Sequence, residues 1–155
     1  MKPITNTVEL AEKIISEAFK DKKDKGGVPY VEHLYRVADK LKGETQIDTV
    51  DQDLQTVALL HDLLEDCPEW NCDSLRCLFH EEIVDAVILL TKKPNQEYDK
   101  YIEALATDEY ARRVKIADLE DNMDIRRLHS LGDKDFQRLQ KYLKAYNFLT
   151  NYEVF

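Results

Sequence analysis

Four polar side chains interrupt a run of leucines near the middle of the chain, in Leu59-Leu60-His61-Asp62-Leu63-Leu64-Glu65-Asp66. A helix turns about 100° per residue, so the polar four share one wedge and the leucines fill the other side. Three carboxylates so close would repel by about 2–3 kcal/mol per pair at ~6 Å and an effective dielectric of about 20. A bound cation would turn this repulsion into a binding site. A solvated acidic face is the alternative, although Leu54 and Ala58 also fall within the wedge and no Lys or Arg is interleaved.

A second anomaly is an aspartate on the apolar stripe of the helix expected over about 108–128. The stripe consists of Ala111, Val114, Asp118, Ile125 and Leu128. Asn122, one turn after Asp118, leans onto the same face. A carboxylate buried alone is very costly, so it must be paired, protonated or bound to a metal. This helix alone leaves a buried ion pair and a functional group equally open.

His33 departs from the pattern of the helix expected over about 29–41. Pro29 is well placed to open this helix, because its missing N–H costs nothing in the first turn. His33 lies beside the apolar stripe, whereas Glu32, Arg36 and Asp39 face away. A lone histidine on such a face is more often a satisfied core residue than a ligand.

The elements that must position these side chains are all expected to be helices. A chain of 155 residues with 43% hydrophobic residues fits one domain with one sizeable core, and only 4 Gly and 4 Pro leave few breaks. Helical spacing of apolar residues predicts helices at about 7–20, 29–41, 53–66, 74–79, 81–91, 98–106, 108–128 and 134–152. The last helix would place Phe136, Leu139, Leu143 and Tyr146 along one seam. No segment shows the alternation of a half-buried strand, so the predicted fold class is all-α, a single-domain helical bundle over 1–155.

The net charge of −9 argues against a nucleic-acid duplex as partner, because phosphate backbones need clustered Lys and Arg. A small phosphorylated molecule stays compatible if basic residues gather locally. No run approaches the ~18 apolar residues of a membrane span, and the N-terminus lacks the pattern of a signal peptide. We therefore expect a cytoplasmic protein, with Cys67, Cys72 and Cys77 as free thiols.

Three motifs together resemble one known family, the HD superfamily of phosphohydrolases. Gly27-x-Pro29-Tyr30-x-x-His33 is similar to the segment that carries the family's first histidine ligand. His61-Asp62-x-x-Glu65-Asp66 has the HDxxED form of one branch. Val114-Lys115-Ile116-Ala117-Asp118, followed by Asn122-Met123, resembles the segment with the last aspartate ligand. This trio is characteristic of guanosine tetraphosphate (ppGpp) hydrolases of the RelA/SpoT type. The resemblance covers roughly 22–128, and the helix at 134–152 is expected to pack on that part.

The resemblance implies an HD-type helical bundle that holds one divalent metal ion between three helices. The implied ligands are His33, His61, Asp62 and Asp118. Two imidazoles and two carboxylates leave two positions of an octahedral ion open for a water and a substrate phosphate oxygen. This donor set suits Mn²⁺, which the family implies, or Fe²⁺, and Zn²⁺ would compete.

The implied reaction removes pyrophosphate from the 3′ position of a phosphorylated guanosine nucleotide. Glu65 and Asp66 would act as general acid and base on the attacking water, and holding the histidines in the right tautomer is their alternative role. At 155 residues only the hydrolase part of the longer family members fits.

Substrate contacts are expected from a few residues near the motifs. The candidates are Lys25, Lys115 and Asn122. Asn122 could instead fix Asp118. For Lys22 and Lys23 a solvated surface position is the better interpretation.

Departures from the family's pattern keep other functions open. Leu34 follows His33 where the family usually has Pro, and Asp24 stands where some members carry Arg. Leu119-Glu120-Asp121 replaces Arg-Leu-His. A phosphohydrolase of the same fold acting on a nucleoside monophosphate or the 2′-phosphate of NADPH is one alternative. A non-catalytic helical module that binds metal, nucleotide or protein is another, in which the aromatic-rich last helix could form a homodimer face or simply cap the bundle.

Overall fold

The computed structural model describes residues 6–153, which form nine α-helices and a 3-10 turn with no β-strand. The elements are α1 (Thr7–Ala18), α2 (Val31–Lys40), α3 (Asp48–Leu60), α4 (Leu63–Asp66), α5 (Cys72–Arg76), α6 (Glu81–Leu90), α7 (Tyr98–Ala106), α8 (Glu109–Asn122), η1 (Ile125–Arg127) and α9 (Asp133–Thr150). The prediction of an all-helical, single-domain fold is therefore confirmed. No helix in this described part combines the length and apolarity needed to cross a bilayer.

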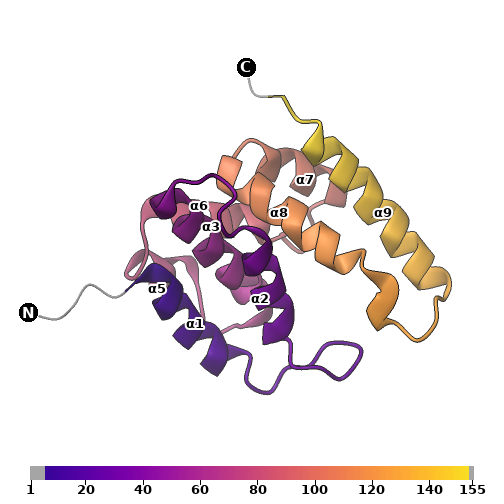
Figure 1. Ribbon diagram of the computed structural model, residues 1–155, viewed down its shortest axis with the longest axis horizontal. Coiled ribbons are helices and arrows are strands. Elements are labelled where there is room, and N and C mark those ends of the chain that lie inside the picture. Colours follow the sequence, from indigo (N-terminus) through magenta and orange to yellow (C-terminus); the bar gives the residue numbers. More distant parts are fainter. Residues whose placement is uncertain (1–5, 154–155) are drawn as a thin grey trace, which may run out of the picture.

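Helix α3 runs through the middle of the bundle and is packed by α1, α2, α6 and α8 (Figure 1). Its last turn, Val57 to Leu60, is apolar on all sides and buried, as expected for a helical segment with no polar face. Leu54 and Ala58, which share a wedge with the polar residues, are both buried. The wedge therefore faces the interior of the protein at this level, and the buried His61 must find partners there, whereas Glu65 and Asp66 are exposed.

The helix expected over 53–66 is in fact two helices with a tight turn between them. Helix α3 begins earlier, at Asp48, because the buried Asp51 carboxylate accepts hydrogen bonds from the Thr45 N–H and hydroxyl, at 2.9 and 2.8 Å. Helix α3 ends at Leu60, and the His61 N–H then bonds to the Ala58 carbonyl, three residues back. The short helix α4 follows at Leu63. His61 and Asp62 thus occupy a junction rather than a helix face.

The helix expected over 108–128 also ends early, at Asn122. The Asp124 side chain accepts the Arg126 N–H and starts the separate turn η1, which stops α8. Ile125 and Leu128 are 42% and 37% exposed, so their assignment to the buried stripe is wrong. Ala111, Val114 and Asp118 of that stripe are buried as expected.

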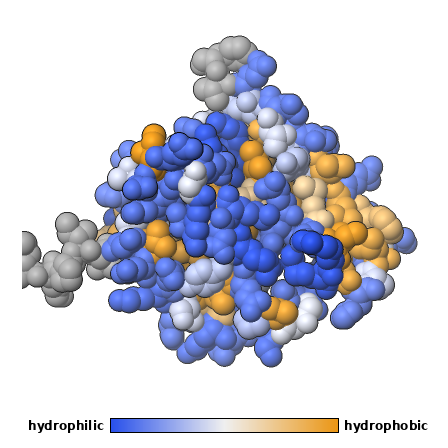
Figure 2. All heavy atoms as spheres, viewed as in Figure 1, coloured by the Kyte–Doolittle hydropathy of each residue, from blue (hydrophilic) through white to orange (hydrophobic). Residues whose placement is uncertain are grey.

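Helix α9 lies along the outside of the bundle against α7 and α8 (Figure 1). Its buried residues are Ala145 and Leu149, with Tyr142 partly buried beside them. Of the predicted seam, Tyr146 is partly buried against the core, but the prediction is wrong for Phe136 and Leu143, which are 57% and 52% exposed. At 100° per residue these two positions point about 160–180° away from Ala145. In the same view, the surface in Figure 2 shows an apolar area on the right, the side on which α9 lies in Figure 1.

Candidate metal centre

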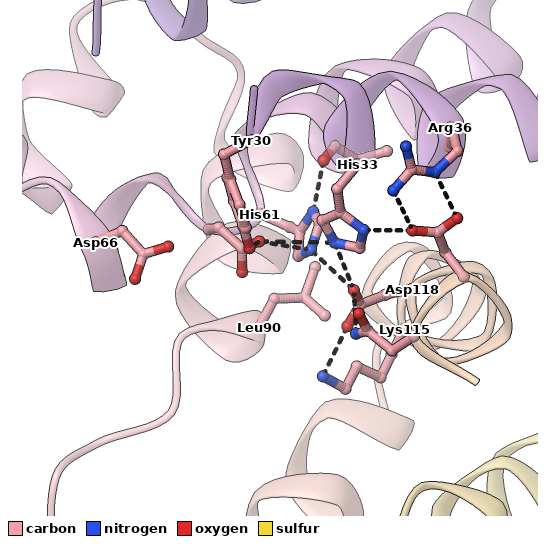
Figure 3. A network of polar contacts seen from close by, with 12 residues as sticks. Tyr30, His33, Arg36, His61, Asp66, Leu90, Lys115 and Asp118 are labelled. Atoms are coloured by element: carbon pink, nitrogen blue, oxygen red, sulfur yellow. Dashed lines mark hydrogen bonds and ion pairs between the residues drawn. The ribbon is translucent and has the colours of Figure 1, made fainter. Parts of the chain in front are cut away.

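Three helical elements bring two imidazoles and a carboxylate into contact at the centre of the bundle (Figure 3). His33 comes from α2, His61 from the end of α3, and Asp118 from α8. The Asp118 Oδ1 atom lies 3.0 Å from His33 Nε2 and 3.3 Å from His61 Nε2. All three residues are buried. Helices α2, α3 and α8 therefore converge on one polar cluster inside an apolar core.

The spacing of these atoms suits a single metal ion. One ligand atom from each of His33, His61 and Asp118 lies within 4.8 Å of the other two. Asp62 Oδ2 is 3.8 Å from His33 Nε2 and 3.2 Å from His61 Nε2. In an octahedron with metal–ligand distances of about 2.1 Å, adjacent ligand atoms are about 3.0 Å apart and opposite ones about 4.2 Å. The observed separations of 3.0–3.8 Å fall within this range.

The second ring nitrogen of each histidine determines where its lone pair points. His61 Nδ1 lies 2.6 Å from the Ala58 carbonyl oxygen, which can only accept, so Nδ1 carries the proton. His33 Nδ1 lies 2.6 Å from Asp121 Oδ2. In neutral imidazoles held this way, both Nε2 atoms present lone pairs to the centre. His61 Nε2 is buried and has no hydrogen-bond partner among residues 6–153, as expected for an atom that is free to bind a metal.

Electrostatics of the cluster also favour a cation. Burial lowers the pKa of His33, but hydrogen bonds to Asp118 and Asp121 outweigh it and raise the pKa to about 9. For Asp118, burial raises the pKa, but Lys115 and His61 outweigh that effect and hold it well below its usual value. The pocket between the side chains therefore attracts positive charge, which a divalent ion would supply.

Asp62 is held by a contact that sequence reasoning did not anticipate. The Tyr30 hydroxyl donates to Asp62 Oδ2 at 2.5 Å. Burial, followed by the nearby Asp62 carboxylate, raises the pKa of Tyr30 far above its usual range, so the phenol keeps its proton and acts as donor. The only signal in the sequence was Tyr30's place in the motif before His33, since its partner lies 32 residues away.

The two carboxylates of α4 have different partners. Glu65 Oε1 accepts the Lys92 N–H at 3.0 Å, and burial is the main cause that raises the pKa of Glu65. Asp66 Oδ2 lies 2.7 Å from Lys22 Nζ, and that ammonium group also stands 4.2 Å from the centre of the Tyr30 ring. Lys22 was expected to be a solvated surface lysine. The structure instead places it against Asp66, 44 residues away, a contact that no local pattern signals.

The predicted substrate-contacting residues fall in two places. Lys115 Nζ lies 2.9 Å from Asp118 Oδ2, and Asn122 Nδ2 donates to Asp118 Oδ1 at 3.0 Å. Both therefore hold Asp118, which is the alternative role considered for Asn122. Lys25 is exposed in the loop before α2 and stays a prediction.

Comparison with known proteins identifies the fold. No protein-family model matches the chain, and no curated protein matches it either. The solved structure of a metazoan ortholog of SpoT, described as hydrolysing ppGpp and playing a role in starvation responses, is similar with a TM-score of 0.78. The two sequences are 22% identical, and the match covers 97% of this chain and 89% of the other. The chain thus has the helical fold of that enzyme over nearly its whole length.

Proposed function

We propose that this protein is a metal-dependent phosphohydrolase that removes pyrophosphate from the 3′ position of guanosine tetraphosphate. The observation that carries the proposal is the buried cluster of His33, His61 and Asp118, with His61 Nε2 lacking any hydrogen-bond partner. Its support is the fold, which is that of a solved protein described as hydrolysing ppGpp.

The ligands in this proposal are His33, His61, Asp62 and Asp118, with Mn²⁺ as the preferred ion and Fe²⁺ or Zn²⁺ as competitors. When bound, such an ion supplies a Lewis acid that makes water more acidic and offsets negative charge on a phosphoryl group. Tyr30 keeps Asp62 in place through its hydroxyl. Lys115 and Asn122 do the same for Asp118.

The chain's own acid and base are Glu65 and Asp66. A water oxygen attacks the phosphorus attached to the ribose 3′ oxygen, the bond between that phosphorus and the 3′ oxygen breaks, and the products are guanosine 5′-diphosphate and pyrophosphate. Glu65 has the raised pKa suited to taking the proton from the water and returning it to the 3′ oxygen. Asp66, paired with Lys22, orients the water.

A basic cluster beside the centre supports an anionic substrate. Burial, together with the nearby charges of Lys115, Lys92 and Arg138, lowers the pKa of Lys141. Positive charge that acts on Lys141 in a chain of net charge −9 suits a ligand with several phosphate groups, although Lys115 and Arg138 are themselves paired with Asp118 and Asp135. Lys25, in the loop before α2, is a further candidate for contact with the substrate.

A second candidate, a nucleotide phosphatase of the same fold, is favoured by one observation. The Asp24 carboxylate accepts the N–H groups of Gly26 and Val28, at 2.8 and 3.0 Å, and so closes its own loop. Because an aspartate occupies this position and is engaged in its own loop, no arginine guanidinium is present here to contact a nucleobase. A nucleoside monophosphate or the 2′-phosphate of NADPH is the corresponding substrate.

The test is to incubate the purified protein with Mn²⁺ and guanosine tetraphosphate, NADPH or nucleoside monophosphates, and to analyse the products. Release of pyrophosphate from guanosine tetraphosphate, lost in Asp62→Ala and kept in the surface control His80→Ala, is the expected result. Turnover of another nucleotide alone selects the second candidate. Metal binding with no turnover of any of them leaves a non-catalytic module.

A further inference from the structure

Asp121 is a buried carboxylate, 3% exposed, to which the proposed reaction assigns no role. It lies near the end of α8, one turn after Asp118. Its Oδ2 atom is 2.6 Å from His33 Nδ1. A buried carboxylate needs donors on both oxygens, so the identity of its other partners determines what it does.

Two arginines from different elements hold Asp121. Arg36 Nε donates to Oδ1 at 2.8 Å and Arg36 Nη2 to Oδ2 at 3.1 Å (Figure 3). Arg127 Nη2 donates to the Asp121 backbone oxygen at 2.8 Å and reaches Oδ2 at 3.4 Å. Arg36 comes from α2 and Arg127 from η1, so the carboxylate is fixed by two separate elements. We call Arg36 and Arg127 together the clamp.

We propose that Asp121, held by the clamp, is a positioning residue that orients His33 as a metal ligand; the inference rests on the metal centre of the proposed function. An ionised carboxylate only accepts hydrogen bonds, so His33 Nδ1 must be the donor and Nε2 is left to face the centre. His61 obtains the same orientation from a carbonyl of its own helix, three residues back. His33 obtains it from a side chain 88 residues away.

The arrangement ties two helices together at matching intervals. His33 and Arg36 are three residues apart on α2, and Asp118 and Asp121 are three residues apart on α8. His33 contacts both aspartates, through Nε2 at 3.0 Å and Nδ1 at 2.6 Å. Any slippage of α2 along α8 would break both contacts at once. The clamp therefore stabilises the position of α2 relative to α8.

This feature belongs to the segment Leu119-Glu120-Asp121, where the sequence departs from Arg-Leu-His. The departure thus lies beside a ligand, and Asp121 supplies there a strong acceptor for the ligand's ring. Leu119 is fully buried in the core, so the same three residues also anchor α8.

The experiment compares Asp121→Ala and Asp121→Asn with the matched control Asp124→Asn. Asp124 is an arginine-paired aspartate three residues further on, at 2.8 Å from Arg126 and 3.6 Å from Arg127, and has no contact with a candidate ligand. Calorimetric titration with Mn²⁺ and Zn²⁺ measures affinity. Nitrogen-15 NMR of the Zn²⁺-loaded protein measures the proton on His33 Nδ1. Urea unfolding of the metal-free variants measures stability separately.

We expect Asp121→Ala to weaken metal binding by about 10–100-fold and to lose the slowly exchanging Nδ1 proton. Asp121→Asn keeps an acceptor oxygen and should recover much of the affinity and the Nδ1 signal. Asp124→Asn should match the wild type in both. Should Asp121→Ala not fold, Arg36→Gln loosens the clamp without removing the acceptor, and a loss of several-fold is expected.

Wild-type affinity and an unchanged Nδ1 signal in Asp121→Ala, or in Arg36→Gln if that variant is the one available, would overturn the clamp while leaving the proposed function intact. A wild-type protein that binds neither metal would overturn both. Equal losses in Asp121→Asn and Asp121→Ala would show that the carboxylate's charge, and not its acceptor geometry, matters, and would also overturn the inference.

Discussion

At the scale of single residues, the proposed metal centre depends on the hydrogen-bond partner of each ligand. His61 is hydrogen-bonded to a backbone carbonyl, His33 to Asp121, and Asp62 to the Tyr30 hydroxyl. For each histidine the partner satisfies the second ring nitrogen inside the buried cluster, where an unpaired group would cost about 1–3 kcal/mol. Tyr30 instead donates to the same Asp62 oxygen that faces the histidines. The supporting residues therefore do as much to shape the site as the ligands themselves.

Glu65 provides a prediction on pH dependence. Its pKa is raised above 4.5, first by burial and then by Asp62 and Asp66, and the Lys92 N–H and Lys115 only partly oppose this. A base must be deprotonated to act, so activity should fall as the pH drops through this raised pKa. Glu65→Gln should lower kcat by about 10²–10⁴-fold and abolish this acid limb in the pH–rate profile.

The control for this experiment is Glu103→Gln, an exposed glutamate on α7 paired only with Lys100. It should keep the wild-type rate and profile. Wild-type kcat with the same acid limb in Glu65→Gln would contradict the role of Glu65.

Lys22 gives a second prediction at this scale. Lys22→Met removes the ion pair with Asp66 and the contact with the Tyr30 ring. Because the lysine side chain is 40% exposed, solvent screens the pair, and we expect a loss of about fivefold in kcat, or ~1 kcal/mol, with unchanged metal affinity. Steady-state kinetics and metal titration check the two parts. A larger loss of metal affinity than of kcat would contradict it.

At the scale of elements, the break between α3 and α4 is what separates the proposed roles. Helix α3 delivers His61 to the cluster, and α4 carries Glu65 and Asp66 towards Lys92 and Lys22. In one continuous helix, all four polar residues would have to share a single wedge. The turn at His61 and Asp62 lets the buried ligands and the solvent-accessible carboxylates point in different directions.

Helix α9 allows a matched test of which face packs. Leu149→Ala should lower the free energy of unfolding by about 2–5 kcal/mol, because Leu149 is enclosed between α9 and the bundle. Leu143→Ala, on the exposed face of the same helix, should change it by no more than about 0.5 kcal/mol. Urea unfolding curves measure both. Equal losses in the two variants would contradict the observed packing of α9.

At the scale of the whole molecule, a metal bound at the cluster would couple its binding to folding. The proposed ligands come from separate helices and would be far apart in the unfolded chain, so a metal that binds them stabilises the folded state. At a free metal concentration of 100 Kd the gain is about 2.7 kcal/mol. Thermal unfolding should shift upward with Mn²⁺ and back with a chelator.

His61→Ala should respond far less to the metal than the wild type in the same experiment. A wild-type melting temperature that Mn²⁺ and chelator leave unchanged would contradict the coupling.

Much of the fold and part of the candidate site can be predicted from the sequence alone, because the patterns that indicate them lie within single helices. Helical spacing of apolar residues identified an all-helical fold, and one helix, α7, was predicted with its observed bounds. Asp118 stood out as a carboxylate on an apolar stripe, and His61 as part of a polar wedge that also holds Leu54 and Ala58; both are buried. A charge in an apolar stripe is informative because its burial without a partner costs too much.

The hydrogen-bond partners of these groups, and which faces of two helices are packed, follow from the three-dimensional arrangement and not from the sequence pattern. The bonds from Tyr30 to Asp62, Lys22 to Asp66 and His33 to Asp121 join residues 32, 44 and 88 positions apart, and no local period encodes such pairs. Helix α9 carries apolar residues on both faces, so its periodicity could not tell the packed face from the exposed one. Long-range contacts depend on how helices stack, and that is settled by the complementarity of whole surfaces.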